Sequence, residues 1–284
     1  MTAPSPEFCK LFQWAQERGA PPAGIAPHPA QASPAPPMPA PFRPSDPQLL
    51  NDESSYVTRY AQGFKTDFDT GTAILWDILF SDSIAGNFDP GSDDFIYVTA
   101  WNRAAFGCEA LVAYYRSTAP GIAVFDHKYT RFTAPAPQPI SAFDGYVSTQ
   151  TVGGIDVRSI TVANMTYQGE GGWINEVYIP ATNALGPYTL YRSQPYSATP
   201  ADQKTRFGFD GAYGPTIEPS RGITNPYKGT SPIGWANARL ANRDGRGNWS
   251  PWQPLSTEQS TIEPGLGGFT AKYSEPNFTA VLTT

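Results

Sequence analysis

The stretch from residue 20 to residue 47 constrains the fold of this chain more than any other feature of its sequence. Eleven of these 28 residues are proline, and alanine is the commonest of the others. Such a composition cannot form a packed core, and it favours extended polyproline geometry with a rise of about 3.1 Å per residue. We therefore expect a semi-rigid tether that separates an N-terminal segment, residues 1–19, from a body, residues 48–284.

The segment before the tether has the signals of an amphipathic helix over residues 5–19. Ser5 can cap the helix, Pro6 suits its first position, and Gly19 can close its end. The apolar residues follow the helical spacing i, i+3, i+4 and i+7 and form one stripe: Phe8, Leu11, Phe12 and Ala15. The sequence leaves two accounts open, a stripe that packs on its own body, which we favour, or one that engages another subunit or partner.

The body has the composition of an all-β protein. It is rich in glycine, proline and aromatic residues, and only 15% of the chain is charged. Apolar runs bounded by turn residues predict ten strands: Thr72–Phe80, Phe95–Trp101, Ala110–Arg116, Ile122–Phe125, Ile155–Val162, Trp173–Ile179, Tyr188–Tyr191, Arg206–Phe209, Trp235–Ala241 and Phe278–Leu282. We expect a β-sandwich of jelly-roll type. A second small sandwich at the C-terminus, with a boundary between residues 185 and 230, is the alternative division.

Charge and cysteine content argue against several classes of protein. The net charge of −6, with scattered Lys and Arg, offers no field for nucleic acid. The apolar runs are too short for a membrane span, and no Sec-type signal is visible, so the localisation stays open, with an extracellular or particle-associated place compatible. The two cysteines, Cys9 and Cys108, match neither a disulfide framework nor a zinc motif, and whether they pair is open.

One segment resembles a known family. The residues from Trp235 to Trp252, WANARLANRDGRGNWSPW, contain a strand ending in Ala and Asn, a glycine-containing turn and a Trp-Ser pair that opens the next strand. This pattern resembles the last hairpin of fibronectin type III domains. The resemblance implies a binding or spacer role and no chemistry. The turn formers around Asp244 and Gly247 predict a β-hairpin in any case.

Aromatic residues beside amides and carboxylates mark two candidate glycan sites. An aromatic face packs on a pyranose ring, while Asn and Asp bind its hydroxyls. The first group lies on the predicted turn: Trp249, Trp252, Asn248 and Asp244. The second comprises Trp173 and Asn175, which share one face of a strand. Core packing is the alternative use of each tryptophan.

A calcium site is the candidate for a cofactor. Four oxygen-bearing side chains surround a glycine turn, Asn87, Asp89, Asp93 and Asp94. These are the ligands that Ca²⁺ prefers, although the twelve-residue EF-hand pattern is absent. A plain acidic turn is the alternative interpretation.

Catalytic motifs are scarce. His127 is the one histidine of the predicted body, and no nucleophile elbow accompanies it. Carboxylate pairs such as Asp93 with Asp94 or Glu170 with Glu176 have the residue types that glycoside hydrolysis needs, as does Glu109 beside an apolar run. The sequence does not establish the distances within such a pair.

These observations favour a non-catalytic recognition or assembly protein. Its β-sandwich would bind glycans or a protein partner, and its N-terminal helix would be a docking element that can also form a homo-oligomer. Two alternatives remain, a polysaccharide hydrolase or lyase with a jelly-roll cleft, and a structural subunit of a viral particle or extracellular assembly.

Overall fold

The structure is a computed structural model that describes part of the chain. The described residues are 5–11, 60–61, 64–65, 70–80, 95–102, 108–115, 121–126, 131–132, 138–152, 154–180, 188–195, 197, 212–219, 233–254, 270–274 and 279–283. Strands dominate these residues, and the strand pairings among them are antiparallel. The predicted all-β class is therefore confirmed for the described part of the chain.

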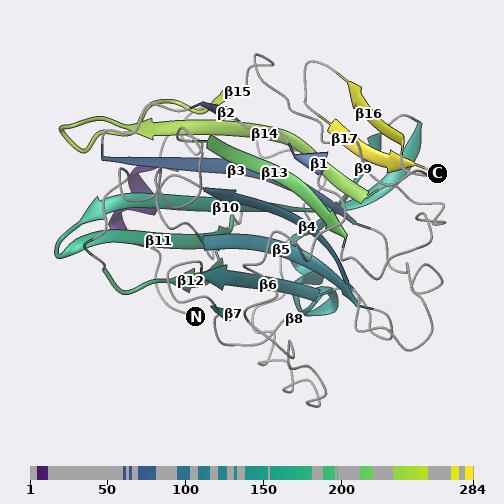
Figure 1. The fold of residues 1–284 in the computed structure, drawn as a ribbon, viewed down its shortest axis with the longest axis horizontal. Helices are drawn as coiled ribbons and strands as arrows, with labels where there is room; N and C mark the ends of the chain where they lie inside the picture. Colours follow the sequence, from purple (N-terminus) through teal and green to yellow (C-terminus); the bar gives the residue numbers. More distant parts are fainter. Residues whose placement is uncertain are drawn as a thin grey trace.

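Among the described residues, the larger of two sheets has nine strands (Figure 1). Its main path runs in the order β12 (Tyr188–Arg192), β11 (Gly172–Ile179), β10 (Ile155–Gly169), β3 (Gly71–Phe80), β14 (Ile233–Arg243), β17 (Thr279–Thr283) and β16 (Thr270–Ser274). Two further strands pair off this path, β9 (Val147–Val152) with β10 and β15 (Gln253–Pro254) with β14. The sheet thus places β3, from early in the chain, between two strands that come much later.

The smaller sheet has eight strands. Its path is β1 (Tyr60–Ala61), β13 (Ala212–Pro219), β4 (Phe95–Asn102), β5 (Cys108–Tyr115), β6 (Gly121–Asp126) and β7 (Arg131–Phe132), with β2 (Phe64–Lys65) on β13 and β8 (Gln138–Pro139) on β6. A 3₁₀ segment, η3 (Ile140–Tyr146), leads from β8 into β9. The two sheets contact each other, since β5 lies against β10 and β11 and β4 lies against β3.

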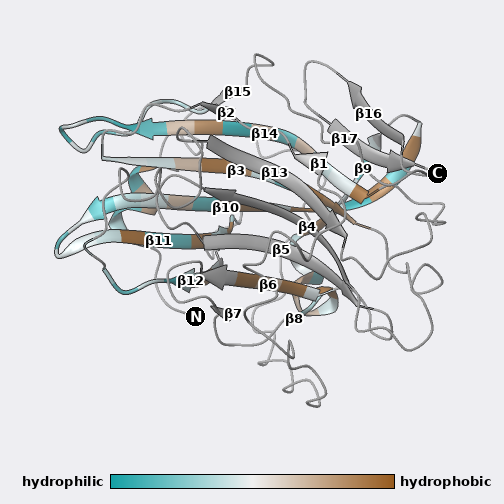
Figure 2. Ribbon diagram, viewed as in Figure 1, coloured by the Kyte–Doolittle hydropathy of each residue, from teal (hydrophilic) through white to brown (hydrophobic). Residues whose placement is uncertain are grey.

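Strand β3 is buried on both faces, which explains its nearly continuous apolar sequence. Ile74, Trp76 and Ile78 lie on one face and are fully buried. Ala73 lies on the other face and belongs to an apolar cluster that includes the N-terminal residues Phe8 and Leu11. Figure 2 shows hydrophobic residues along β3, β6 and β11 and a hydrophilic turn after β14. The larger sheet therefore has two covered faces in this region.

The hairpin predicted between Trp235 and Trp252 is present. Strand β14 turns at residues 244–248, and β15 pairs back to it with Arg239 opposite Pro254. The predicted strand Arg206–Phe209, the tether and residues 12–19 lie outside the described residues. Strand β13 was not predicted, because Pro215 and Pro219 lower the strand signal of its sequence.

Gly71 gives a test of how closely β3 and β10 pack. A Cβ atom at Gly71 would lie 2.8 Å from the Cβ of Tyr167 and 2.9 Å from the backbone oxygen of Thr166. These atoms cannot swing away, so we expect Gly71→Ala to lower the free energy of unfolding by about 1–3 kcal/mol. The midpoint of urea unfolding, followed by circular dichroism, measures the loss.

Gly245 supplies the matched control for that substitution. A Cβ at Gly245 would meet nothing within 4 Å, so Gly245→Ala should leave the midpoint nearly unchanged. Equal midpoints for the two variants would contradict the close packing of β3 on β10.

Candidate functional site

An N-terminal helix lies on one face of the larger sheet. Residues 6–11 are helical, and Ser5 caps them, because its Oγ accepts a hydrogen bond of 3.1 Å from the backbone N–H of Phe8. The backbone N–H of Cys9 donates to the Ser5 carbonyl oxygen at 3.0 Å, which closes the first turn. Cys9 itself is an exposed, free cysteine, so the helix presents one face to solvent and one to the sheet.

The sheet receives the helix on a floor of small side chains. Gly71 and Ala73 of β3 lie opposite Tyr167 and Met165 of β10, and Ala241 of β14 lies opposite Ala73. Phe8 and Leu11 fill the space above, and both are buried. We call the sheet residues that share the apolar cluster or bond with the helix the docking face: Ala73, Ala163, Met165, Tyr167, Ile174, Glu176, Tyr178, Ala241, Arg243, Trp249 and Trp252.

Phe8 makes the closest aromatic contact of the docking face. Its ring stacks on that of Tyr178, with 3.8 Å between the centroids and 23° between the planes. Phe8 is 1% exposed, and Tyr178 is fully buried. Because aromatic stacking adds to the effect of apolar burial, this pair is the main apolar anchor of the helix.

A buried carboxylate, Glu176, lies below the start of the helix. Its Oε2 accepts hydrogen bonds from Ser5 Oγ at 2.6 Å and from Tyr178 Oη at 3.0 Å. Its Oε1 accepts a bond of 3.1 Å from Tyr167 Oη and lies 2.9 Å from Nε of Arg192. Four groups from four segments of the chain therefore surround one charge that has no exposed surface.

Burial dominates the proton equilibria of this cluster. It raises the pKa of Glu176, and the hydrogen bonds from Ser5 and Tyr178 and the charge of Arg192 offset the rise only in part. Burial and the neighbouring charge of Glu176 raise the pKa of Tyr167 to about 12 and raise that of Tyr178 as well. Both phenols therefore remain protonated and act as donors.

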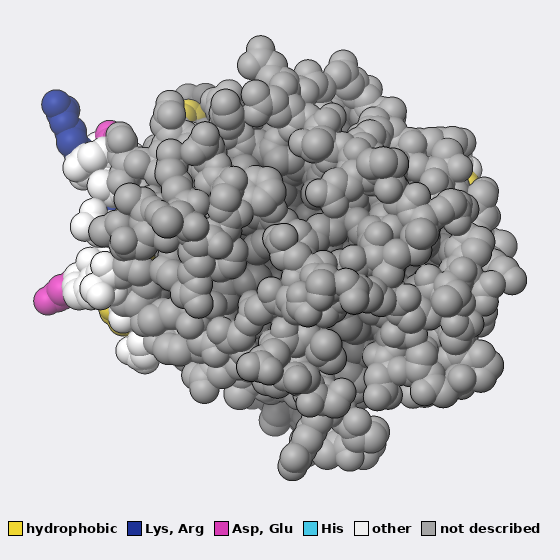
Figure 3. All heavy atoms as spheres, in the orientation of Figure 1, with side chains coloured by type: hydrophobic (Ala, Val, Ile, Leu, Met, Phe, Trp, Pro, Cys, Tyr) yellow, Lys and Arg dark blue, Asp and Glu magenta, His cyan; other side chains and the backbone are white. Residues whose placement is uncertain are grey.

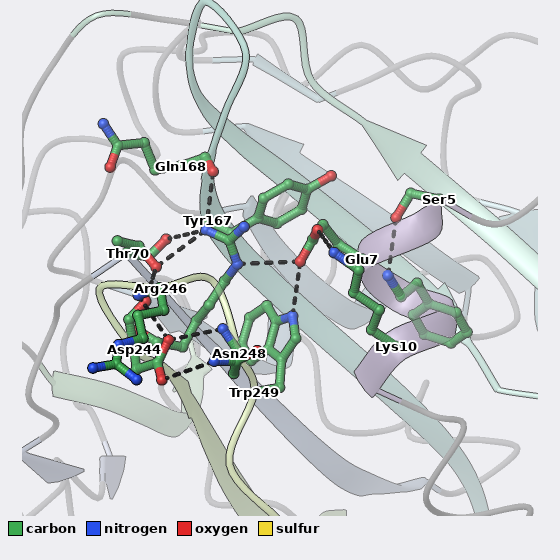
Figure 4. Close-up of polar contacts among 12 residues, drawn as sticks. Ser5, Glu7, Lys10, Thr70, Tyr167, Gln168, Asp244, Arg246, Asn248 and Trp249 are labelled. Carbon is green, nitrogen blue, oxygen red and sulfur yellow. Dashed lines mark hydrogen bonds and ion pairs between the residues drawn. The ribbon is translucent and has the colours of Figure 1, made fainter.

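A second polar anchor holds the first turn of the helix. Oε2 of Glu7 accepts hydrogen bonds of 3.1 Å from Arg243 Nε and 3.0 Å from Trp249 Nε1 (Figure 4). Lys10 Nζ lies 2.9 Å from Oε1 of Glu7. Burial raises the pKa of Glu7, but the bonds from Lys10 and Trp249 and the charge of Arg243 outweigh burial, so the pKa falls below its usual value.

Arg243 is held in place by the sheet as well as by the helix. Its Nη1 donates to the backbone oxygen of Gln168 and to Oγ1 of Thr70, each at 3.1 Å, and its guanidinium lies 5.8 Å from the ring centroid of Tyr167. These contacts fix the position of the guanidinium on the docking face. The Arg243 side chain is 13% exposed, so the ion pair with Glu7 is only weakly screened by water.

The turn after β14 carries two of the predicted glycan residues. Asp244 and Asn248 are exposed, and Oδ1 of Asp244 accepts bonds from the backbone N–H groups of Arg246 and Asn248 at 2.9 and 2.8 Å. The bond from the Asn248 backbone is the largest of several effects that lower the pKa of Asp244. Asp244 therefore shapes the turn that places Trp249 beside Glu7.

The aromatic candidates for glycan binding are largely covered. Trp252 is 7% exposed and Trp173 is 6% exposed, whereas Asn175 is fully buried. Trp249 is partly buried against the apolar cluster and bonded to Glu7. In the described structure the predicted glycan residues thus serve packing and helix docking, with Asp244 and Asn248 alone exposed.

Charged side chains mark the edge of the molecule where these turns lie. In Figure 3, a Lys or Arg side chain and an Asp or Glu side chain project from the edge where Figure 1 places the turn after β14 and the β10–β11 turn. Asp244 and Arg246 are exposed charged residues of the first turn, and Glu170 is an exposed charged residue of the second. Glu170 is thus exposed, whereas Glu176, its predicted partner in a carboxylate pair, is enclosed.

Several other candidates fall outside the described residues. These are the predicted calcium ligands Asn87, Asp89, Asp93 and Asp94, and His127. Within the part of the chain that the structure describes, no group of three or more His, Cys, Asp or Glu side chains can hold a metal ion. Among the described helices, none has the length and apolarity that a membrane crossing requires.

A second polar cluster lies farther along the same sheet, around Asp77. Its Oδ2 accepts bonds of 2.7 Å from Gln150 and from Asn237, and its Oδ1 accepts one of 2.7 Å from Thr161. Asn237 has a φ of 53° at an irregularity in β14, a conformation that Asn tolerates. Because its two oxygens are already bonded, Asp77 anchors this irregularity to β3.

Comparisons with known proteins add no family to this description. No protein-family model matches the chain, and no curated protein matches its sequence. The likeness of residues 235–252 to a fibronectin type III hairpin therefore stays a prediction.

Phe8 should dominate the free energy of helix docking. Phe8→Ala removes the stack on Tyr178 and opens a cavity over Ala73, so we expect it to weaken docking by about 3 kcal/mol. Hydrogen exchange at the amides of residues 8 and 9, which bond to Ser5, measures the change. Lys10, whose side chain is 58% exposed, is the control. Lys10→Ala should change docking by less than about 0.5 kcal/mol, and equal effects would contradict the assignment.

Docking should also depend on pH through Glu7. Because the pKa of Glu7 is lowered in the docked state, its contribution is present above its ordinary value of 4.5 and is lost as the pH falls through the docked-state pKa. Glu7→Gln should weaken docking by about 1–2 kcal/mol at pH 7. It should weaken docking by much less once the pH lies below the docked-state pKa of Glu7. Protection factors at residues 8 and 9 between pH 3 and 7 test this. A constant difference would show that the charge of Glu7 plays no part.

Proposed function

We propose that this protein is a non-catalytic assembly protein whose N-terminal helix is a docking element. One observation carries the proposal: a seven-residue segment, residues 5–11, is matched to a sheet face by a cap, a stack and two carboxylates. The docking face recognises an amphipathic helix through apolar anchors and paired charges, which is a common mode of peptide recognition.

The proposed body is a β-sandwich. The contacts of β5 with β10 and β11, and of β4 with β3, support two sheets packed on each other. Strands β4, β5 and β6 follow one another within a single sheet, and so do β9, β10, β11 and β12. This order of consecutive strands does not establish a jelly roll, so a jelly-roll-like arrangement stays a prediction within this proposal.

A protein partner is favoured over a glycan. Trp173, Trp252 and Asn175 are buried, and Trp249 donates its indole N–H to Glu7. A sugar that bonded to the indole N–H of Trp249 would have to displace Glu7. The contacts of the helix with the docking face also support a structural subunit of a larger assembly. In such a subunit, a helix and the face that recognises it would attach one copy to the next.

Light scattering across a concentration series tests the proposed function. We expect the mass of the full chain to rise above that of the monomer with increasing concentration. Phe8→Asp, which places a charge against Tyr178, should hold the mass at that of the monomer. Cys9→Asp places the same charge on the exposed side of the same helix and is the matched control. A full chain that stays monomeric throughout, and an assembly unaffected by Phe8→Asp, would each contradict the proposal.

A further inference from the structure

We infer that the docking face also accepts the helix of a second copy of this chain, so that two copies exchange residues 5–11. This inference rests on the proposed function and names the partner. It begins from the fact that the helix contacts with the docking face among the described residues come from a short, contiguous segment. An identical segment from another copy can therefore make the same contacts without any change in the sheet.

The docking face favours an occupant with a hydroxyl, a carboxylate and apolar side chains at the spacing found in the helix. Without the helix, Glu176 loses the hydroxyl of Ser5 and Arg243 loses the carboxylate of Glu7. Tyr178 and Ala73 would then expose apolar surface that Phe8 and Leu11 now cover. A buried carboxylate that loses a donor is costly, so a copy whose own helix is elsewhere favours a helix from a neighbour.

The length of the intervening sequence permits the exchange. The 28 residues from 20 to 47 would span about 85 Å in the polyproline geometry that their composition favours. A compact body of 237 residues, from 48 to 284, has a diameter of about 45 Å. A stretch of that length exceeds the diameter of the body, so the sequence allows the helix to reach an adjacent copy.

Concentration decides between the two modes. A tethered segment meets its own docking face at an effective concentration of about the millimolar range, and this value falls as the tether lengthens. Docking on the same copy therefore prevails in dilute solution, whereas exchange prevails where copies are crowded. Because the contacts are the same, the exchanged form needs no new recognition surface.

Charge reversal of the Glu7–Arg243 pair separates exchange from docking on the same copy. Glu7→Arg places two cations together, and Arg243→Glu places two carboxylates together, so each variant alone should have an undocked helix and the mass of a monomer. In an equimolar mixture, each helix is complementary only to the docking face of the other variant. We expect the mixture to have twice the mass of either variant alone.

Two controls accompany the mixture. Glu170→Arg and Arg246→Glu make the same charge changes at exposed turn positions, and their mixture should behave as the wild type. The chain that carries both Glu7→Arg and Arg243→Glu should regain hydrogen-exchange protection at residues 8 and 9. Restored protection in that chain, together with a monomeric mixture, would overturn the exchange. The proposed function would then still be tested by the concentration series on the wild-type chain.

A second measurement does not depend on Arg243, which also holds Thr70 and Gln168. The full-length Phe8→Asp chain, whose own helix is displaced, is titrated with a peptide of residues 1–19 labelled at Cys9, an exposed position of the helix. We expect saturable binding, at least tenfold weaker for a peptide that carries Phe8→Asp. Absence of saturable binding, or equal binding of the two peptides, would overturn the inference.

Discussion

The buried carboxylate of Glu176 is the constraint around which the described structure is organised. A charge without exposed surface needs several donors, and these come from the N-terminal cap, β10, β11 and β12. The same cluster therefore ties one edge of the larger sheet to the helix. Such networks contribute less to net stability than to specificity, because a helix in another register would leave the charge without the hydroxyl of Ser5.

The apolar part of the contact follows from residue size. Ala73 and Ala241 leave space above the sheet, and the large side chains of Phe8 and Leu11 occupy it. Gly71 has a further role, because a Cβ atom there would collide with Tyr167. The small residues thus bring the helix close enough for Glu7 and Ser5 to reach their partners in the sheet.

The strands were the part of the fold that the sequence predicted best. Runs such as Thr72–Phe80 and Trp173–Ile179 correspond to β3 and β11, because a long apolar run between turn residues has few other uses. Two prolines concealed β13, and the polar sequence of β9 concealed that strand. The larger sheet joins residues more than 150 positions apart, as Gly71 and Arg243 show, and local patterns carry no information on such pairings.

The site was predicted in its parts but not in its assembly. The helical spacing of Phe8 and Leu11 required a partner surface. The sequence signal for that surface was the pair of small residues Ala73 in β3 and Ala241 in β14. In β11, the sequence predicted a binding site at Trp173 and Asn175. The helix instead contacts Glu176 and Tyr178, which lie on the opposite face of the strand. Alternation separates the two faces of a strand, but it does not say which face a distant helix covers.

The two carboxylates of the contact have opposite proton equilibria, and this limits how acid affects docking. Acid removes the contribution of Glu7, whose pKa is lowered, but it relieves the cost of burying the charge of Glu176, whose pKa is raised. The two contributions therefore have opposite signs and act in different pH ranges, that of Glu176 above the ordinary carboxyl pKa of 4.5 and that of Glu7 below it. Glu176 and Arg243 of the sheet then act mainly to select a helix with Ser and Glu at the correct spacing, while the stack of Phe8 on Tyr178 supplies most of the affinity.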